Sequence, residues 1–289
     1  MTGAVKQAGA DLQTSKGWLR AVRSWHDPAM LQSLRDRLAG GLLVAARRLA
    51  SDAGWSQLQA GFGAPSMLGG LLGLSARGLT PRRIVDGGAC KGDWTRLARQ
   101  VFPHAEVLMI EPQSRHATTL EQVCLALAPG VRFAPRLVGP AEMEAVDFVV
   151  LDDVGGGTGS SVRPENSDVP RHVVKLPMTT LDSLVESTGF GAPDFIKLDV
   201  QGYEIEVLKG ARCCLSTADF VLLEVSVWPY NAGAPLAAEL LAWMDQQGLR
   251  TFEIFDLSRR PDGLLVQMDV LFVRKSHPLL QDVQTRFSA

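Results

Sequence analysis

The stretch from Arg83 to Pro112, RIVDGGACKGDWTRLARQVFPHAEVLMIEP, decides the fold. It opens with a short apolar run, Ile84–Val85, and passes through a glycine-rich turn into a helical pattern of apolar residues. A second apolar run, Val107–Ile110, ends on the acid Glu111. A strand, a glycine loop, a helix and a second strand form a βαβ unit, so we predict the ligand-binding half of a doubly wound sheet.

The residue at position 86 distinguishes this loop from a dinucleotide fingerprint, which has glycine two places before the glycine found here at Gly88. This chain has Asp86 there. A carboxylate repels the negative charge of a pyrophosphate, whereas it attracts a ligand with an ammonium group, such as S-adenosylmethionine. Glu111 follows Gly92 by 19 residues, near the ~20 expected for an acid that binds a ribose diol. The alternative is an ordinary buried unit whose glycines only permit tight packing. The predicted cofactor-binding residues here are Asp86, Gly87, Gly88, Ala89, Gly92, Glu111 and Pro112.

Composition places the chain among ordinary globular proteins. It has 289 residues, a net charge of -2, 21% charged and 46% hydrophobic residues. Its apolar runs are short, and the first residues lack the apolar region of a secretory signal. None of the four cysteines forms a C-x-x-C pair, so free thiols and a cytoplasmic location are expected.

The chain divides by pattern into a helical N-terminal extension, residues 1–75, and a main domain, residues 76–289. Residues 1–50 hold eight Lys and Arg against three acids, an excess of +5. A basic amphipathic segment suits peripheral contact with a membrane glycolipid. We favour docking of these helices on the main domain or on a second subunit, as in a homo-oligomer.

The main domain continues as alternating strands and helices and closes with two consecutive strands. This course predicts a Rossmann-like α/β fold with a seven-stranded class I methyltransferase-type sheet. A helix is expected over 114–127, another over 179–186 with Thr180 as N-cap, and another over 203–211. We expect a loop at 155–161, which either covers the cofactor or substrate or is a connection exposed to solvent. Strands are predicted at 131–137, 147–151, 172–176, 194–200, 220–227, 251–257 and 266–273.

Ligands of such sheets bind beyond the carboxyl ends of the strands. There, Asp199 and Glu224 border the space next to the cofactor, and Val138 and Gly139 are candidates for the adenine edge. Lys197 lies on a strand buried on both faces and needs an anionic partner, for which we predict Glu204 or Glu224.

Metal binding is the other interpretation of Asp199 with Glu224, because paired carboxylates also hold Mg²⁺. We favour a site without metal, since the sequence has no cluster of His and Cys ligands. His104 and His116 occur singly, and we expect both at the surface.

Four segments resemble the FkbM family of S-adenosylmethionine-dependent methyltransferases: DGGACKG with IEP, TTLDSL, DFIKLDVQGYEIEVLKGA and LLEVS. The resemblance covers residues 83–275, and its most specific part is Ile196–Ala211. Cys90 replaces the usual Asn of the loop, and Gln201 replaces the usual Glu before Gly202. The second departure removes a charge and puts any role of that carboxylate in doubt.

The resemblance implies S-adenosylmethionine-dependent O-methylation of a hydroxyl group on a sugar, glycolipid or glycosylated natural product. We predict Asp199 as general base or substrate-orienting acid, with Lys197 and Glu224 in support. The alternatives are a structural role for Lys197, a non-catalytic cofactor-binding subunit and, less favoured because of Asp86, a nicotinamide oxidoreductase. Nucleic acid is not an expected partner, because no basic stripe interleaved with aromatic residues flanks the site.

Overall fold

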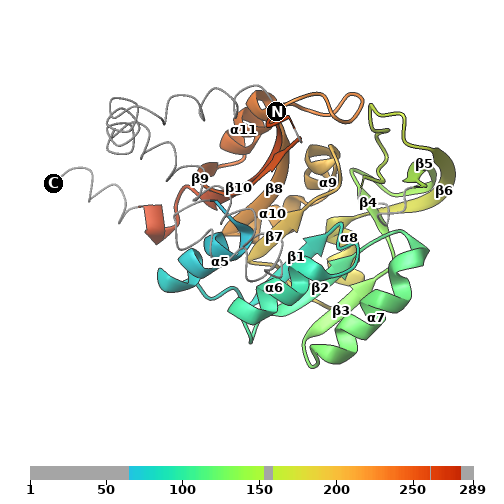
Figure 1. Ribbon diagram of the computed structural model, residues 1–289. Helices are drawn as coiled ribbons and strands as arrows, with labels where there is room; N and C mark the ends of the chain where they lie inside the picture. The colour runs from blue at the N-terminus through green and yellow to red at the C-terminus, as the bar shows by residue number, and fades with distance from the viewer. Residues whose placement is uncertain (1–64, 153–158, 261, 281–289) are drawn as a thin grey trace, which may run out of the picture. The chain divides into compact units, whose positions relative to one another are not determined.

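The computed structural model describes residues 65–152, 159–260 and 262–280 (Figure 1). The predicted amphipathic segment and most of the 155–161 loop lie outside these residues. The boundary between extension and main domain at residue 75 stays a prediction.

The predicted βαβ unit is confirmed. Strand β1 (Arg83–Gly87) leads through the glycine loop into α6 (Asp93–Val101) and then into β2 (Glu106–Ile110), which is parallel to β1. Gly88 and Gly92 have φ values of 73° and 79°, in the left-handed region that favours glycine. The loop therefore turns tightly at the carboxyl end of β1.

The main sheet has seven strands in the order β3-β2-β1-β7-β8-β10-β9, as Figure 1 shows. Strand β10 is antiparallel to both of its neighbours, whereas the strands from β3 to β8 are parallel. This arrangement confirms the predicted seven-stranded sheet with its closing hairpin. The added strands are β3 (Val131–Ala134), β7 (Phe195–Leu198), β8 (Phe220–Ser226), β9 (Leu249–Arg259) and β10 (Leu265–Arg274).

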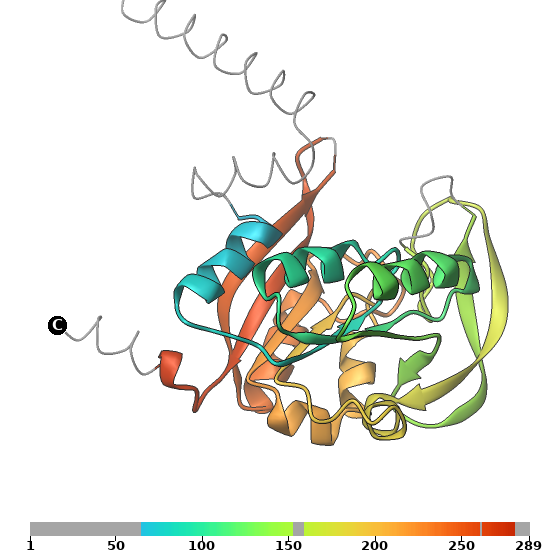
Figure 2. The same cartoon turned by 90° about the horizontal axis from the view of Figure 1, so that it is seen from below.

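Helices cover both faces of this sheet (Figure 2). Ile84 belongs to the core on one face and Val85 to the core on the other, as the alternation of side chains along a strand requires. One face packs against α5 (Met67–Ala76), α6 and α7 (Ala117–Ala126), the last entered by the short helix η2 (Ser114–His116). The other face packs against α8 (Leu181–Ser187), α9 (Glu204–Lys209), α10 (Arg212–Thr217) and α11 (Ala237–Gln246).

A second sheet of three strands, in the order β4-β6-β5, lies at the β3 side of the main sheet in Figure 1. It consists of β4 (Leu137–Gly139), β5 (Met143–Leu151) and β6 (Arg171–Thr180). The predicted single strand over 131–137 is wrong, because β3 ends at Ala134 and the chain changes sheet before Leu137. Pro135 lies at the break and has no N–H to continue a ladder.

Candidate active site

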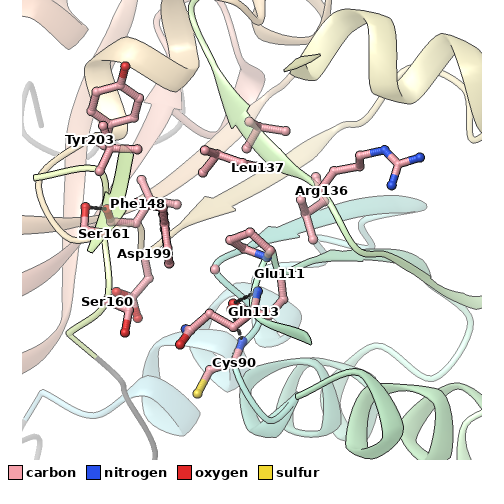
Figure 3. Close-up of a pocket in the computed structure, with 16 residues that line it drawn as sticks. Cys90, Glu111, Gln113, Arg136, Leu137, Phe148, Ser160, Ser161, Asp199 and Tyr203 are labelled. Atoms are coloured by element: carbon pink, nitrogen blue, oxygen red, sulfur yellow. Dashed lines mark hydrogen bonds between the residues drawn. The ribbon is translucent and has the colours of Figure 1, made fainter. Parts of the chain in front are cut away.

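A pocket lies at the carboxyl ends of β1, β2 and β7 and is closed on one side by the three-stranded sheet (Figure 3). Its wall combines an apolar part with polar side chains from several segments of the chain. The apolar part includes Ile110, Pro112, Leu137, Val138 and Phe148. The polar part includes Glu111, Gln113, Ser160, Ser161 and Asp199.

The glycine loop forms the floor of the pocket because its backbone approaches β7 closely. A Cβ atom at Gly88 would lie 1.9 Å from the backbone oxygen of Asp199, so no other residue fits without movement of the chain. The N–H groups of Gly88 and Ala89 donate to the carbonyl oxygen of Ile110 at 2.9 and 3.1 Å. The loop is therefore held between the ends of β2 and β7.

Glu111 presents a buried carboxylate at the edge of this floor. Its Oε2 accepts a hydrogen bond from the Cys90 N–H at 3.0 Å, and its Oε1 accepts one from the Gln113 N–H at 2.9 Å. Burial raises the pKa of Glu111, while these two backbone bonds act in the opposite direction. Each carboxylate oxygen can accept a further bond, so Glu111 can also bind a pair of ligand hydroxyls.

Cys90 lines the pocket, and its Sγ lies 3.9 Å from Nε2 of His116. Burial, and then the charge of Glu111, raise the pKa of the Cys90 thiol, so the thiol stays protonated at neutral pH. The prediction that His116 is at the surface is wrong, since the residue is 4% exposed. His104 is exposed as expected.

Lys197 and Asp86 form a buried ion pair beneath the floor. Nζ of Lys197 lies 3.1 Å from Asp86 Oδ1 and 3.7 Å from Asp199 Oδ2, and Thr95 donates to Asp86 Oδ2 at 2.7 Å. Burial by itself lowers the pKa of Lys197, but the carboxylates of Asp86 and Asp199 outweigh it and raise that pKa overall. Lys197 therefore carries its charge at neutral pH.

The predicted partners of Lys197 were Glu204 or Glu224, and this prediction is wrong. Asp86 lies directly opposite Lys197 on the neighbouring parallel strand, which decides the pairing. Glu204 instead accepts from the N–H groups of Val200 and Gly202, at 3.1 Å each, and so fixes the turn after β7. Burial raises the pKa of Glu204 to about 7.

Asp199 is the acid of this group that reaches the pocket, with a side chain that is 36% exposed. Its Oδ1 accepts a hydrogen bond from Nε2 of Gln201 at 2.8 Å. Asp199 follows the last residue of β7, and its N–H donates to the Gly87 carbonyl oxygen. It is thus held beside the glycine loop, across the pocket from Glu111.

Glu224 lies behind Asp199 and is not part of the pocket wall. Its Oε2 accepts from Nε2 of Gln201 at 2.7 Å and from Nε2 of Gln267 at 2.8 Å. Burial, and then the charges of Asp199 and Asp269, raise the pKa of Glu224 well above its usual range.

Sequence reasoning missed the contribution of β10 to this group. Asp269 is opposite Glu224 in the antiparallel register, and burial raises its pKa to about 7. Gln267 precedes it on the same strand. Local patterns do not reveal this pairing, because it depends on how the closing hairpin is aligned with β8.

Some of the other residues predicted to bind the cofactor line the pocket, and the rest lie behind its wall. Gly88, Glu111, Pro112 and Val138 line the pocket. The predicted contact of Asp86 with the cofactor stays a prediction, since its carboxylate is fully buried against Lys197. Four further predicted residues support the wall without being part of it: Gly87, Ala89, Gly92 and Gly139.

Several wall residues carried no sequence signal, among them Gln113, Arg136, Phe148 and Tyr203. Figure 3 shows the guanidinium of Arg136 turned away from the residues around Glu111. The hydroxyl of Ser161 lies 2.9 Å from the Val200 carbonyl oxygen and 3.1 Å from that of Gln201. The segment that contains Ser161 is thereby tied to the turn after β7.

Across the described ranges, no three His, Cys, Asp or Glu side chains are grouped so that they could hold a metal ion. Between Asp199 and Glu224 the structure has the amide nitrogen of Gln201. No helix in the described part of the chain has the length and apolar character needed to cross a bilayer.

Comparison with known proteins gives a family and several distant relatives. Residues 86–251 match the family described as methyltransferase FkbM domain. Hexuronic acid methyltransferase AglP of Haloferax volcanii is 46% identical over 44 residues, which are 15% of this chain and 18% of that protein. The chain therefore aligns with less than a fifth of the length of this curated relative.

Among solved structures, the chain resembles precorrin-6y C5,15-methyltransferase from Geobacter metallireducens, with a TM-score of 0.42 and 10% identity over 72% of this chain and 87% of that one. It also resembles magnesium protoporphyrin IX methyltransferase from Synechocystis, with a TM-score of 0.42 and 13% identity over 72% of this chain and 77% of that one.

The family match includes both sides of the pocket, from Asp86 and Glu111 to Asp199. It spans more than half of the 289 residues. The chain belongs to the FkbM methyltransferase family.

Proposed function

We propose that the protein transfers a methyl group from S-adenosylmethionine to a hydroxyl group of a sugar, glycolipid or glycosylated natural product. Family membership supports the reaction class. The observation that carries the proposal is the pocket itself, with the glycine loop and Glu111 on one side and the exposed carboxylate of Asp199 on the other.

The residues of the pocket fit this cofactor. Glu111 and Gln113 suit the ribose hydroxyls, and the apolar wall with Leu137, Val138 and Phe148 suits the adenine ring. The backbone at Gly88 suits the amino-acid end, because the missing Cβ leaves room beside Asp199. The cofactor supplies an electrophilic sulfonium methyl group, and the chain's own task is to hold it near the acceptor oxygen.

Asp199 is the proposed general base. Asp199 accepts the proton of the acceptor hydroxyl while the hydroxyl oxygen bonds to the methyl carbon. The sulfur–methyl bond breaks, and its electron pair stays on the sulfur of the departing thioether. Lys197 places its positive charge 3.7 Å from Asp199 Oδ2. Glu224 supports Asp199 through the shared Gln201 amide. This chemistry requires no metal ion.

A sugar hydroxyl as acceptor rests on two further considerations. The short aligned segment belongs to a relative whose name is hexuronic acid methyltransferase. The pocket wall offers the polar side chains of Ser160, Ser161 and Asp199 and the aromatic ring of Tyr203. Hydroxyl-rich rings bind to such polar groups and stack on aromatic side chains.

The test is transfer of a labelled methyl group from S-adenosylmethionine to a panel of neutral, amino and uronic glycosides. The proposal expects a methyl ether in at least one product, located by fragmentation in a mass spectrometer. Methyl transfer to nitrogen or carbon alone would contradict it. Cofactor binding with no turnover on any hydroxylated acceptor would favour a non-catalytic subunit.

A further inference from the structure

Arg115 lies on η2 with an exposed side chain, and its guanidinium joins three segments around the pocket. Its Nη2 donates to Gln113 Oε1 and lies 3.3 Å from Ser160 Oγ, and its Nη1 lies 3.3 Å from the Leu151 carbonyl oxygen. Gln113 and Ser160 are both part of the pocket wall. In Figure 3, Gln113 lies beside Glu111, whereas Ser160 lies on the other side of the pocket. Arg115 therefore connects two sides of the pocket.

One end of this connection is anchored in the backbone. The Leu151 N–H donates to Ser160 Oγ at 3.1 Å. The backbones of Val149 and Ser161 exchange two hydrogen bonds, at 2.8 and 3.0 Å. The guanidinium of Arg115 thus holds a corner that hydrogen bonds already fix to the end of β5.

The other end acts on the amide of Gln113. A guanidinium has only donors, so the amide atom that faces Arg115 is the oxygen. The Gln113 side chain also forms a hydrogen bond with the Glu111 carboxylate, to which only its amide nitrogen can donate. The three side chains form a relay from an exposed guanidinium, through an amide, to a buried carboxylate.

This relay selects one of two orientations of the Gln113 amide. The terminal torsion of glutamine is roughly two-fold, so the reverse orientation is the alternative. There the amide oxygen would face the Glu111 carboxylate and the amide nitrogen would face Arg115, and both contacts would be repulsive. Arg115 therefore fixes the polar edge of the pocket, which consists of Glu111 and Gln113.

We propose that Arg115 is a positioning residue for the cofactor: through Gln113 it holds the polar edge in the geometry that binds the ribose of S-adenosylmethionine. The inference rests on the proposed function, which assigns Glu111 and Gln113 to the ribose hydroxyls. Arg115 itself is not assigned contact with the cofactor, because it is not part of the pocket wall. Groups that are held in place before binding lose less freedom when the ligand arrives, so binding is tighter.

The experiment is a double-mutant cycle on the binding of S-adenosylhomocysteine, measured by calorimetry with the whole chain. The variants are Arg115→Gln, Gln113→Ala and the two combined. Arg96→Gln removes the same charge from an exposed position on α6 and is the control. Urea unfolding of each variant reports whether stability has changed.

We expect Arg115→Gln to weaken binding by roughly three- to tenfold, the net effect of about one hydrogen bond. Its unfolding midpoint should stay close to that of the wild type. In the Gln113→Ala background the same change should alter the dissociation constant by less than about twofold, because Arg115 acts through Gln113. Arg96→Gln should bind as the wild type does.

An equal fold-loss from Arg115→Gln in both backgrounds would overturn the inference. An equal loss in Arg96→Gln would overturn it too, since the charge alone would then explain the effect. The cycle uses binding only, so a failure to find any methylated acceptor would contradict the proposed function and leave the role of Arg115 standing. No binding of S-adenosylhomocysteine by the wild type would contradict both.

Discussion

Asp199 is the residue on which the proposed chemistry depends. It combines access to the pocket with a charged partner in Lys197 and a donor in Gln201. We predict that Asp199→Asn lowers kcat by roughly 10²–10⁴-fold, the usual contribution of a general base. Affinity for S-adenosylhomocysteine should change little. Glu121→Gln on the exposed side of α7 is the control and should keep full activity. Normal turnover of Asp199→Asn would remove it as base.

Glu204 gives a prediction about stability and pH. Its folded pKa of about 7 lies above that of an unfolded glutamate. The folded chain therefore holds this proton longer, and the stability contributed by the protonated group is lost as pH rises from about 4.3 to 7. Glu204→Gln should flatten this fall by roughly 3–4 kcal/mol. Urea unfolding at several pH values measures it, and an unchanged slope would contradict the buried, protonated state.

Single residues also show where sequence reasoning stops. The sequence identifies Lys197 as a buried cation in need of a partner, but it does not identify the partner. Asp86 occupies that position because β1 and β7 are adjacent and in register. The two residues are more than one hundred positions apart in the sequence. Their contact depends on the order of the strands, which is a property of the whole sheet.

At the scale of elements, local signals predicted the helices well. Thr180 caps α8 as expected, with its hydroxyl accepting from the Ser183 N–H at 3.0 Å. The short helix α10 was missed, since its sequence RCCLST directly follows α9 and lacks a side-chain cap. The three-stranded sheet was also missed as a unit, although two of its strands were predicted. Its pairing joins segments that are far apart in the chain.

The glycine loop offers a matched pair of variants. Gly88→Ala places a Cβ 1.9 Å from the Asp199 carbonyl oxygen, whereas Gly78→Ala has a similar positive φ and open space. Gly78→Ala should cost about 1–2 kcal/mol of stability through its backbone alone. Gly88→Ala should cost more and weaken binding of S-adenosylhomocysteine at least tenfold. Equal stability and affinity in the two variants would mean that the close approach of loop and β7 is unimportant.

At the scale of the whole molecule, the alternation of strands and helices predicted the seven-stranded sheet and its closing hairpin. The sheet places Asp86, Lys197, Glu224 and Asp269 in neighbouring strands, although they are far apart in the sequence. This convergence produces both the buried ion pair and the acidic group beside the pocket. Its members on β1, β7 and β8 were recognised from the sequence because strands of one sheet share a carboxyl edge.

Calorimetry with S-adenosylmethionine, S-adenosylhomocysteine and NAD tests the central claim most directly. The pocket should bind the first two with micromolar dissociation constants, and the affinity should fall in Glu111→Leu, which removes the acceptors for the ribose hydroxyls. NAD should give no heat of binding. Tight binding of NAD alone, or binding of S-adenosylmethionine that is unchanged in Glu111→Leu, would contradict the assignment of this pocket.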